Sequence, residues 1–143
     1  MSQPEKLNFT GQYGIRDAVE GDKNFILATF LRGLYYGDSW FSQMPKDIFM
    51  SNYKKVADEL VAENKTTIKI ACLNDSPDVI LGYSILSKDY NTVVWVFVKK
   101  DWRKGGIGRS LIPNKFSSVL HLTTLGKNLL NKFENVIFNP FSL

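Results

Sequence analysis

The sequence contains little cysteine and no long apolar run, and each shortage excludes a class of protein. Cys72 is the only cysteine among the 143 residues, so an internal disulfide is excluded. No apolar run approaches the roughly 20 residues that a membrane-spanning helix needs. The polar segment 1–10 lacks the apolar centre of a secretory signal. A chain with these properties is typical of a reducing compartment, and we expect a cytoplasmic protein.

The sequence also has little histidine and a small net charge. The chain has one histidine and a formal net charge of +4, from 18 Lys and Arg against 14 Asp and Glu. This small excess suits a phosphate-rich ligand. The basic residues are scattered and are not arranged with aromatic stacking positions, so a nucleic-acid partner is not expected. We expect no metal site.

The composition that remains is typical of one globular domain. Apolar residues make up 44% of the chain and charged residues 22%, as in ordinary soluble proteins. A chain of this length can bury its own core. We therefore expect a single domain over residues 1–143, with 1–11 as a loose leader. It would be a monomer or a homodimer, and an edge strand near Val136 could pair with a second copy.

Apolar spacing and turn signals predict alternating strands and helices. Asp22 is suited to cap the first helix, whose apolar face is Phe25, Ile26, Phe30 and Leu34. The second helix would bury Ile48, Phe49, Tyr53, Val56, Leu60 and Val61. The expected elements are a strand at 13–16, a helix from 23, a helix at 45–64, strands at 67–73, 79–86 and 92–98, a helix at 106–113, a strand at 118–123, a helix at 125–133 and a strand at 136–138.

The strand at 92–98 leads into the segment that is richest in chemical information. The strand is apolar at both alternating sets of positions, which predicts a place in the middle of the sheet. The segment Arg103–Gly108 follows, with glycines at 105, 106 and 108, and then a helix. Unpaired N–H groups at a helix start bind phosphate, and glycine lets the backbone approach the ligand. The alternative interpretation is a glycine turn that only joins strand to helix.

The spacing excludes two common phosphate loops. No Gly-Lys-Ser/Thr follows the glycines, as a Walker loop would require, and the three-glycine spacing of a dinucleotide-binding fingerprint is absent. The motif Arg-Lys-Gly-Gly-Ile-Gly at 103–108 instead resembles the Arg/Gln-x-x-Gly-x-Gly/Ala loop of the GCN5-related N-acetyltransferases, the GNAT family. Trp102 before the arginine and Leu111 after the loop also fit, as do Ile-Arg-Asp-Ala at 15–18 and Leu-Gly-Tyr at 81–83.

The resemblance covers about residues 13–138 and implies both a fold and a cosubstrate. The implied fold is α/β (α+β), with a mixed, mostly antiparallel central sheet, helices on both faces and the order β-α-α-β-β-β-α-β-α-β. The implied cosubstrate is acetyl-CoA, with the pyrophosphate on the glycine loop and the pantetheine arm on exposed backbone of the strand at 92–98. The cofactor-binding residues would be Val96, Phe97, Val98, Arg103, Lys104, Gly105, Gly106, Ile107, Gly108 and Arg109.

The sequence departs from the family at several positions. Pro113 leaves room for about two helical turns after the loop. Lys100 stands where the family has a proline, and Leu130 stands where many members have a tyrosine that protonates the departing thiolate. Leucine cannot donate a proton. For the base, His121 is the candidate, since its ordinary pKa suits proton transfer. The alternative is a histidine held in a satisfied hydrogen bond.

Two functions remain open from the sequence. The first is an N-acetyltransferase that moves an acetyl group from acetyl-CoA to a primary amine by direct attack, with Tyr35, Tyr36 and Tyr83 lining the acceptor cleft or packing in the core. The second is a catalytically weak or inactive protein of the same fold that binds another protein through the aromatic run at 34–41. An open acceptor cleft would favour the enzyme, and a filled cleft would favour the binding module.

Overall fold

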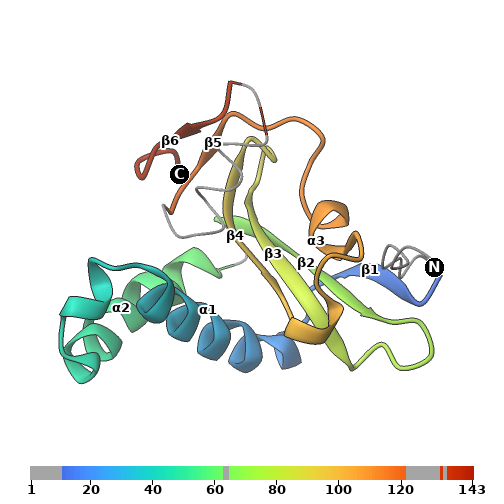
Figure 1. The fold of residues 1–143 in the computed structure, drawn as a ribbon, viewed down its shortest axis with the longest axis horizontal. Helices are drawn as coiled ribbons and strands as arrows, with labels where there is room; N and C mark the ends of the chain where they lie inside the picture. Colours follow the sequence, from blue (N-terminus) through green and yellow to red (C-terminus); the bar gives the residue numbers. More distant parts are fainter. Residues whose placement is uncertain (1–10, 63–64, 122–132, 134) are drawn as a thin grey trace, which may run out of the picture.

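A mixed sheet of six strands organises the molecule, and its strands lie side by side in sequence order (Figure 1). The computed structural model describes residues 11–62, 65–121, 133 and 135–143. The strands are β1 (Tyr13–Asp17), β2 (Thr66–Leu73), β3 (Ile80–Ser87), β4 (Thr92–Val98), β5 (Ser118–Val119) and β6 (Ile137–Phe138). The helices are α1 (Lys23–Gly37), α2 (Lys46–Leu60) and α3 (Ile107–Ser110), with 3₁₀ turns η1 (Glu20–Asp22), η2 (Phe41–Gln43) and η3 (Lys100–Trp102).

The strand directions agree with the predicted fold class. Strands β1, β2, β3 and β4 pair with one another in antiparallel order, whereas β5 runs parallel to β4 and β6 runs parallel to β5. β4 has a neighbour on each side, as its apolar sequence predicts. The strand expected at 118–123 is paired only at Ser118–Val119. The helix expected at 125–133 falls outside the described residues except for Phe133.

Apolar side chains on the two sheet faces form two clusters, each covered by a different part of the chain. α1 buries Ile26, Phe30 and Leu34 on one face, as its spacing predicts. On the opposite face, Ile107 and Leu111 at α3 pack with Phe116 against the sheet. Helices therefore cover both faces (Figure 1). None of the helices in the described ranges combines the length and apolarity that crossing a membrane requires.

The expected buried stripe of α2 is only partly correct. Phe49 is buried and Tyr53 is half-buried, but Ile48 and Val56 are exposed. The helix packs mainly on α1, and its Tyr53 hydroxyl lies 3.3 Å from His121 Nε2, after β5. A periodic apolar pattern does not reveal how wide a surface the neighbouring elements offer, and this leaves the exposed Val56 free to line a cavity.

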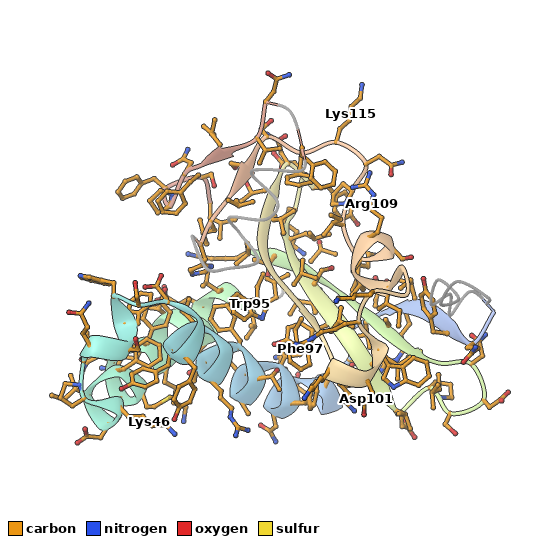
Figure 2. All side chains as sticks on the ribbon, viewed as in Figure 1. Lys46, Trp95, Phe97, Asp101, Arg109 and Lys115 are labelled. Atoms are coloured by element: carbon orange, nitrogen blue, oxygen red, sulfur yellow. The ribbon has the colours of Figure 1, made fainter. Side chains whose placement is uncertain are left out.

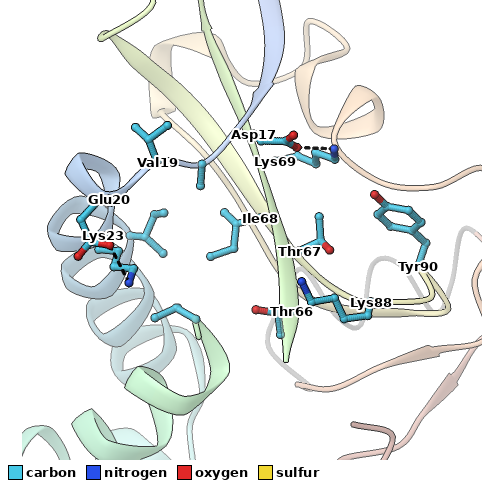
Figure 3. Close-up of a pocket in the computed structure, with 13 residues that line it drawn as sticks. Asp17, Val19, Glu20, Lys23, Thr66, Thr67, Ile68, Lys69, Lys88 and Tyr90 are labelled. Carbon is cyan, nitrogen blue, oxygen red and sulfur yellow. Dashed lines mark hydrogen bonds and ion pairs between the residues drawn. The ribbon is translucent and has the colours of Figure 1, made fainter. Parts of the chain in front are cut away.

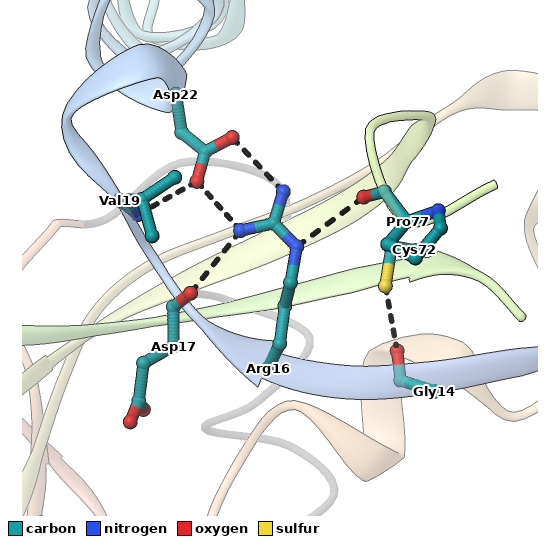
Figure 4. Close-up of polar contacts among 7 residues, drawn as sticks. All are labelled: Gly14, Arg16, Asp17, Val19, Asp22, Cys72 and Pro77. Atoms are coloured by element: carbon teal, nitrogen blue, oxygen red, sulfur yellow. Dashed lines mark hydrogen bonds and ion pairs between the residues drawn. The ribbon is translucent and has the colours of Figure 1, made fainter.

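Asp22 does not cap α1 as expected, because its carboxylate is used elsewhere (Figure 4). Its two oxygens accept hydrogen bonds from the Arg16 guanidinium at 2.7 and 3.0 Å, and one of them also accepts the Val19 N–H. Arg16 donates further to the Pro77 carbonyl. The Arg16 side-chain hydrogen bond, opposed by burial, holds the pKa of Asp22 below its ordinary value. The pair ties the end of β1 to the start of α1.

We expect Asp22→Ala to lower the free energy of unfolding by about 1–3 kcal/mol, because the Val19 N–H and the half-buried Arg16 guanidinium lose their acceptor. Asp17→Ala is the matched control, since its ion pair with Lys69 involves an exposed carboxylate and should matter much less. Denaturant unfolding of both variants tests this. Since the pKa of Asp22 is lowered by folding, its contribution is complete above the ordinary value of 3.8 and is lost as the pH falls through the lowered value. Equal losses in the two variants would contradict the assignment.

Gly82 allows the close approach of β3 to β4. A Cβ at this position would lie 2.5 Å from the Phe97 carbonyl oxygen and 3.1 Å from the Val98 Cα. Both contacts are to backbone, which cannot move aside without disturbing the pairing of the two strands. The glycine in the Leu-Gly-Tyr motif is therefore required by strand packing.

We expect Gly82→Ala to destabilise the protein by about 1–3 kcal/mol, the usual cost of inserting an atom into a packed interior. Gly21→Ala is the control, because a Cβ there meets nothing within 4 Å. Thermal or denaturant unfolding of the two variants checks the difference. If Gly82→Ala is as stable as Gly21→Ala, the close contact between β3 and β4 is not a constraint in solution.

Candidate functional site

The glycine loop connects η3 to α3 and has the backbone conformation of an anion-binding turn. Lys104 and Gly106 have φ angles of 64° and 95°, in the left-handed region. The loop is held to the end of β4, because Arg103 Nε donates to the Val98 carbonyl oxygen at 2.8 Å. α3 that follows is a single turn, shorter than the two turns that Pro113 allows. Its last turn is anchored by Ser84 Oγ, which donates to the Leu111 carbonyl.

The loop leaves a run of donors unpaired. The N–H groups of residues 104–109 make no backbone hydrogen bond within the described part of the chain, whereas Ser110 and Leu111 donate to Gly106 and Ile107. Consecutive free N–H groups in a turn form a concave site for an anion. A Cβ built on Gly106 meets nothing within 4 Å, so a side chain at this position would enter open space. Arg103, Lys104 and Arg109 are exposed around it.

A β-bulge at Val94 changes the register in the middle of β4. Ile85 pairs with Trp95, but the next residue of β3, Leu86, pairs with Val93. Val94 and Trp95 consecutively face the α1 side of the sheet as a result. Figure 2 shows Trp95 and Phe97 between β4 and α1, with Arg109 on the other side of the sheet. A Cβ on Gly33 of α1 would lie 2.7 Å from the Trp95 ring, so this glycine lets the helix approach the bulge.

Beyond the bulge, β4 has an edge that faces away from β3 and on which only the Val98 carbonyl has a described partner, Arg103 Nε. The Lys99 N–H donates to Leu81 on β3, so strand alternation turns the N–H and C=O groups of Val96 and Val98 to the opposite edge. The last bond between the backbones of β4 and the segment after β5 joins Leu120 N–H to the Val93 carbonyl. No described strand pairs with the edge at Val96 and Val98. Phe97 faces β3 with its backbone and packs its ring on Phe25.

His121 lies where the chain separates from β4, beside the bulge. Its Nδ1 is 2.9 Å from the Val94 carbonyl, which can only accept a hydrogen bond, so Nδ1 carries the proton. Nε2 therefore holds a lone pair, 3.3 Å from the Tyr53 hydroxyl. Burial is the main cause that lowers the pKa of His121, opposed by the bond to Val94 and the charge of Asp38. The ring is neutral at neutral pH, with its basic nitrogen on the α2 side.

The three tyrosines named as acceptor-site candidates are placed differently. Tyr83 is fully buried and its hydroxyl lies 2.7 Å from Thr29 Oγ1 and 3.1 Å from the Ile26 carbonyl. Tyr35 is buried and donates to the Met44 carbonyl. These contacts favour the packing role for both. Tyr36 is exposed under the Lys46 ammonium.

A cavity of about 410 Å³ opens beside His121, between α2 with the η2 segment and the C-terminal strands. Its walls are largely aromatic and apolar, and they include Trp40, Phe41, Tyr53, Leu120, His121 and Phe138. Asp38 supplies the one carboxylate side chain among the described lining residues, and no lysine or arginine is among them. Sequence reasoning did not assign Tyr53 or Asp38 to a site, because Tyr53 lies in an ordinary apolar stripe and Asp38 in an irregular segment.

A second cavity, of about 450 Å³, lies between α1 and β2 (Figure 3). Its walls are polar, and two ion pairs neutralise part of its charge, Asp17 with Lys69 and Glu20 with Lys23. None of its described lining residues belongs to β4, the glycine loop or β5. The cavity beside His121 has no described lining residue in these three segments either, but His121 itself bonds to the Val94 carbonyl on β4. This contact makes it the better candidate for a reaction that involves β4.

Comparisons with known proteins identify the fold. No family model matches the sequence, and no curated protein is significantly similar to it. Among solved structures, a candidate acetyl transferase from Pyrococcus furiosus matches 70% of this chain and 69% of its own at 19% identity, with a TM-score of 0.55. A candidate acetyltransferase from Clostridium difficile 630 matches 90% of this chain and 79% of its own at 17% identity, with a TM-score of 0.51. The chain shares their fold, which confirms the predicted fold class.

Proposed function

We propose that the chain is an N-acetyltransferase that transfers the acetyl group of acetyl-CoA to a primary amine. One observation carries the proposal: the unpaired N–H groups of loop residues 104–109 lie next to the edge of β4 at Val96 and Val98, which pairs with no described strand and whose Val98 carbonyl accepts only from Arg103 Nε. An extended ligand with a phosphorylated end and an amide-containing arm could use both. The description of the two matched proteins as candidate acetyltransferases supports the same function.

The loop would hold the pyrophosphate through its backbone. A phosphate beside the loop would satisfy N–H donors that otherwise bond to water. Arg103 is positioned by its bond to Val98, and Lys104 and Arg109 add positive charge nearby. The pantetheine amides would bond to Val96 and Val98 as a neighbouring strand would. Bound in this way, the thioester would lie near the bulge and His121.

The chain would then promote attack by the amine mainly through position. His121 Nε2 would accept the proton that the ammonium group must lose before its nitrogen can attack the acetyl carbon. The new bond joins nitrogen to the acetyl carbon, the carbon–sulfur bond breaks, and the thiolate of coenzyme A leaves. Leu130, at the position of the family's tyrosine, cannot donate a proton, so water would protonate the departing thiolate.

The cavity beside His121 favours the enzyme over the binding module. The two functions differ in the acceptor cleft, which would be open in an enzyme and filled in a non-catalytic protein. The cavity is within the range of about 300–1,000 Å³ that is usual for small-molecule sites. It adjoins the candidate base rather than lying elsewhere on the surface.

The proposal is tested by isothermal titration of acetyl-CoA into the purified protein, followed by an assay of amine-dependent thiol release. Micromolar binding and thiol release that requires an amine are expected. Binding without turnover for any amine would leave a coenzyme A-binding protein. A wild-type protein that binds no acetyl-CoA would overturn the proposed function and direct the search to a protein partner at residues 34–41.

A further inference from the structure

The cavity beside His121 has a composition that selects for a particular kind of ligand. Its described walls combine aromatic rings with aliphatic side chains and contain one carboxylate but no cationic side chain. An anionic ligand would meet no counter-ion, and a strongly polar neutral ligand would lose hydrogen bonds to water without replacement. A ligand with an apolar body and one positive charge matches the walls.

Asp38 is placed to receive that charge. Its Oδ1 accepts hydrogen bonds from the Trp40 and Phe41 N–H groups at 2.8 and 3.3 Å, and these bonds fix the carboxylate at the start of η2. Oδ2 makes no hydrogen bond within the described ranges. The charge also acts on two groups across the cavity, since it contributes to a raised pKa at Tyr53 and opposes the lowering at His121. The carboxylate therefore faces the same space as the candidate base.

The aromatic side chains provide a second, independent attraction for a cation. Trp40 is 69% exposed although it lines the cavity, and Phe138 is 42% exposed on the opposite wall. Exposed indole and phenyl rings cost free energy in water and bind organic cations through their faces. Phe41 packs on Trp40 and on Phe49 and Tyr53, so these rings are held in place before a ligand arrives.

We propose that this cavity binds a small primary ammonium compound with an aromatic or branched apolar body, its ammonium group between Asp38 and His121. The assignment of this cavity as the acceptor pocket rests on the proposed function. The ammonium is bound by Asp38 as a cation, and the nitrogen becomes nucleophilic only when its proton passes to His121 Nε2. The apolar body lies against Trp40, Phe41 and Phe138. A protein lysine or N-terminus would bring polar backbone groups into the cavity, whose walls offer few hydrogen-bond partners for them.

The test is isothermal titration with three probes of matched shape or charge: 2-phenylethylamine, 2-phenylethanol and methylamine. Each is titrated into free protein and into protein saturated with coenzyme A. We expect 2-phenylethylamine to bind at least about tenfold more tightly than either the uncharged alcohol or the small amine, because each lacks one of the two attractions. Equal affinity of amine and alcohol would overturn the proposal.

The variant that tests the charge is Asp38→Asn, which keeps an oxygen to accept the Trp40 and Phe41 N–H groups and removes only the charge. The control is Asp58→Asn, an exposed residue of α2 that does not line the cavity. Asp38→Asn should weaken 2-phenylethylamine at least about tenfold, and the control should not. Unchanged affinity in Asp38→Asn would overturn the proposal.

Titration of acetyl-CoA alone separates this proposal from the proposed function. If the wild type binds acetyl-CoA but binds 2-phenylethylamine in neither state, the pocket assignment fails and the acetyltransferase proposal stands. If it binds the amine with the Asp38 dependence but not acetyl-CoA, the pocket assignment stands and the acetyltransferase proposal fails.

Discussion

Gly106→Glu is expected to weaken acetyl-CoA binding by at least about 100-fold, a loss of about 2.7 kcal/mol in binding free energy. A Cβ on Gly106 meets nothing within 4 Å, so a side chain there would extend from the loop into open space. A glutamate there would place a carboxylate where the pyrophosphate is proposed to bind, and two anions at close range repel each other strongly when little water separates them. Isothermal titration of acetyl-CoA measures the loss.

Two further variants separate charge from conformation. Gly106→Ala adds only a methyl group, but at a φ of 95° that side chain costs about 1–3 kcal/mol of strain. It should lower the stability and weaken binding less than the glutamate does. Gly21→Glu adds the same charge at an exposed position away from the loop and should leave binding unchanged. Full affinity in Gly106→Glu, with an intact fold, would exclude the loop as the pyrophosphate site.

The backbone of the candidate site could be located from the sequence because its signals are local. The apolar run of β4 requires cover on both faces, and the three glycines after it are compatible with few structures other than a tight loop before a helix. The same holds for α1, in which a buried stripe follows the helical period. Each of these features depends on the residue types within one short segment.

The features that depend on contacts between segments could not be predicted in this way. The bulge at Val94 is set by the register of β3 against β4, and nothing in the residues 92–98 marks one valine over its neighbours. Asp22 is a good helix cap by type, yet the guanidinium of Arg16 competes for its oxygens and prevails. Val56 belongs to the apolar stripe of α2, but its side chain is 42% exposed because the described neighbouring elements do not cover it. In all three cases the contacts with another segment of the chain determine the local structure.

His121 illustrates both limits. The sequence marks it as the one side chain with a suitable ordinary pKa on the strand near the expected separation from β4. It does not reveal that the Val94 carbonyl fixes the tautomer, that Nε2 lies 3.3 Å from the Tyr53 hydroxyl, or that His121 and Asp38 line the same cavity. The bond to Val94 also shows that a structural role and a basic role are compatible, since each uses a different ring nitrogen.

His121→Asn is expected to lower kcat by about 100-fold while acetyl-CoA binding stays within a fewfold of the wild type. The amide nitrogen of asparagine can replace Nδ1 as the donor to Val94, so the local backbone keeps its partner, but no basic nitrogen remains. Stopped turnover assays with a saturating amine, together with acetyl-CoA titration, measure the two effects separately. Equal loss of binding and turnover would indicate a structural role alone.

The pH profile adds a readout that a structural role would not affect. The base form of His121 is the neutral ring, and burial lowers the pKa of the ring below 6.5. Titration of His121 should therefore leave wild-type kcat unchanged above pH 6.5 and reduce it only at lower pH. The asparagine variant should lack that acidic limb. Folding also favours the neutral ring, so protonation of His121 should reduce the stability of the wild type as the pH falls below 6.5, and not that of the variant. A variant that retains the acidic limb in kcat would assign the limb to another group and remove His121 as the base.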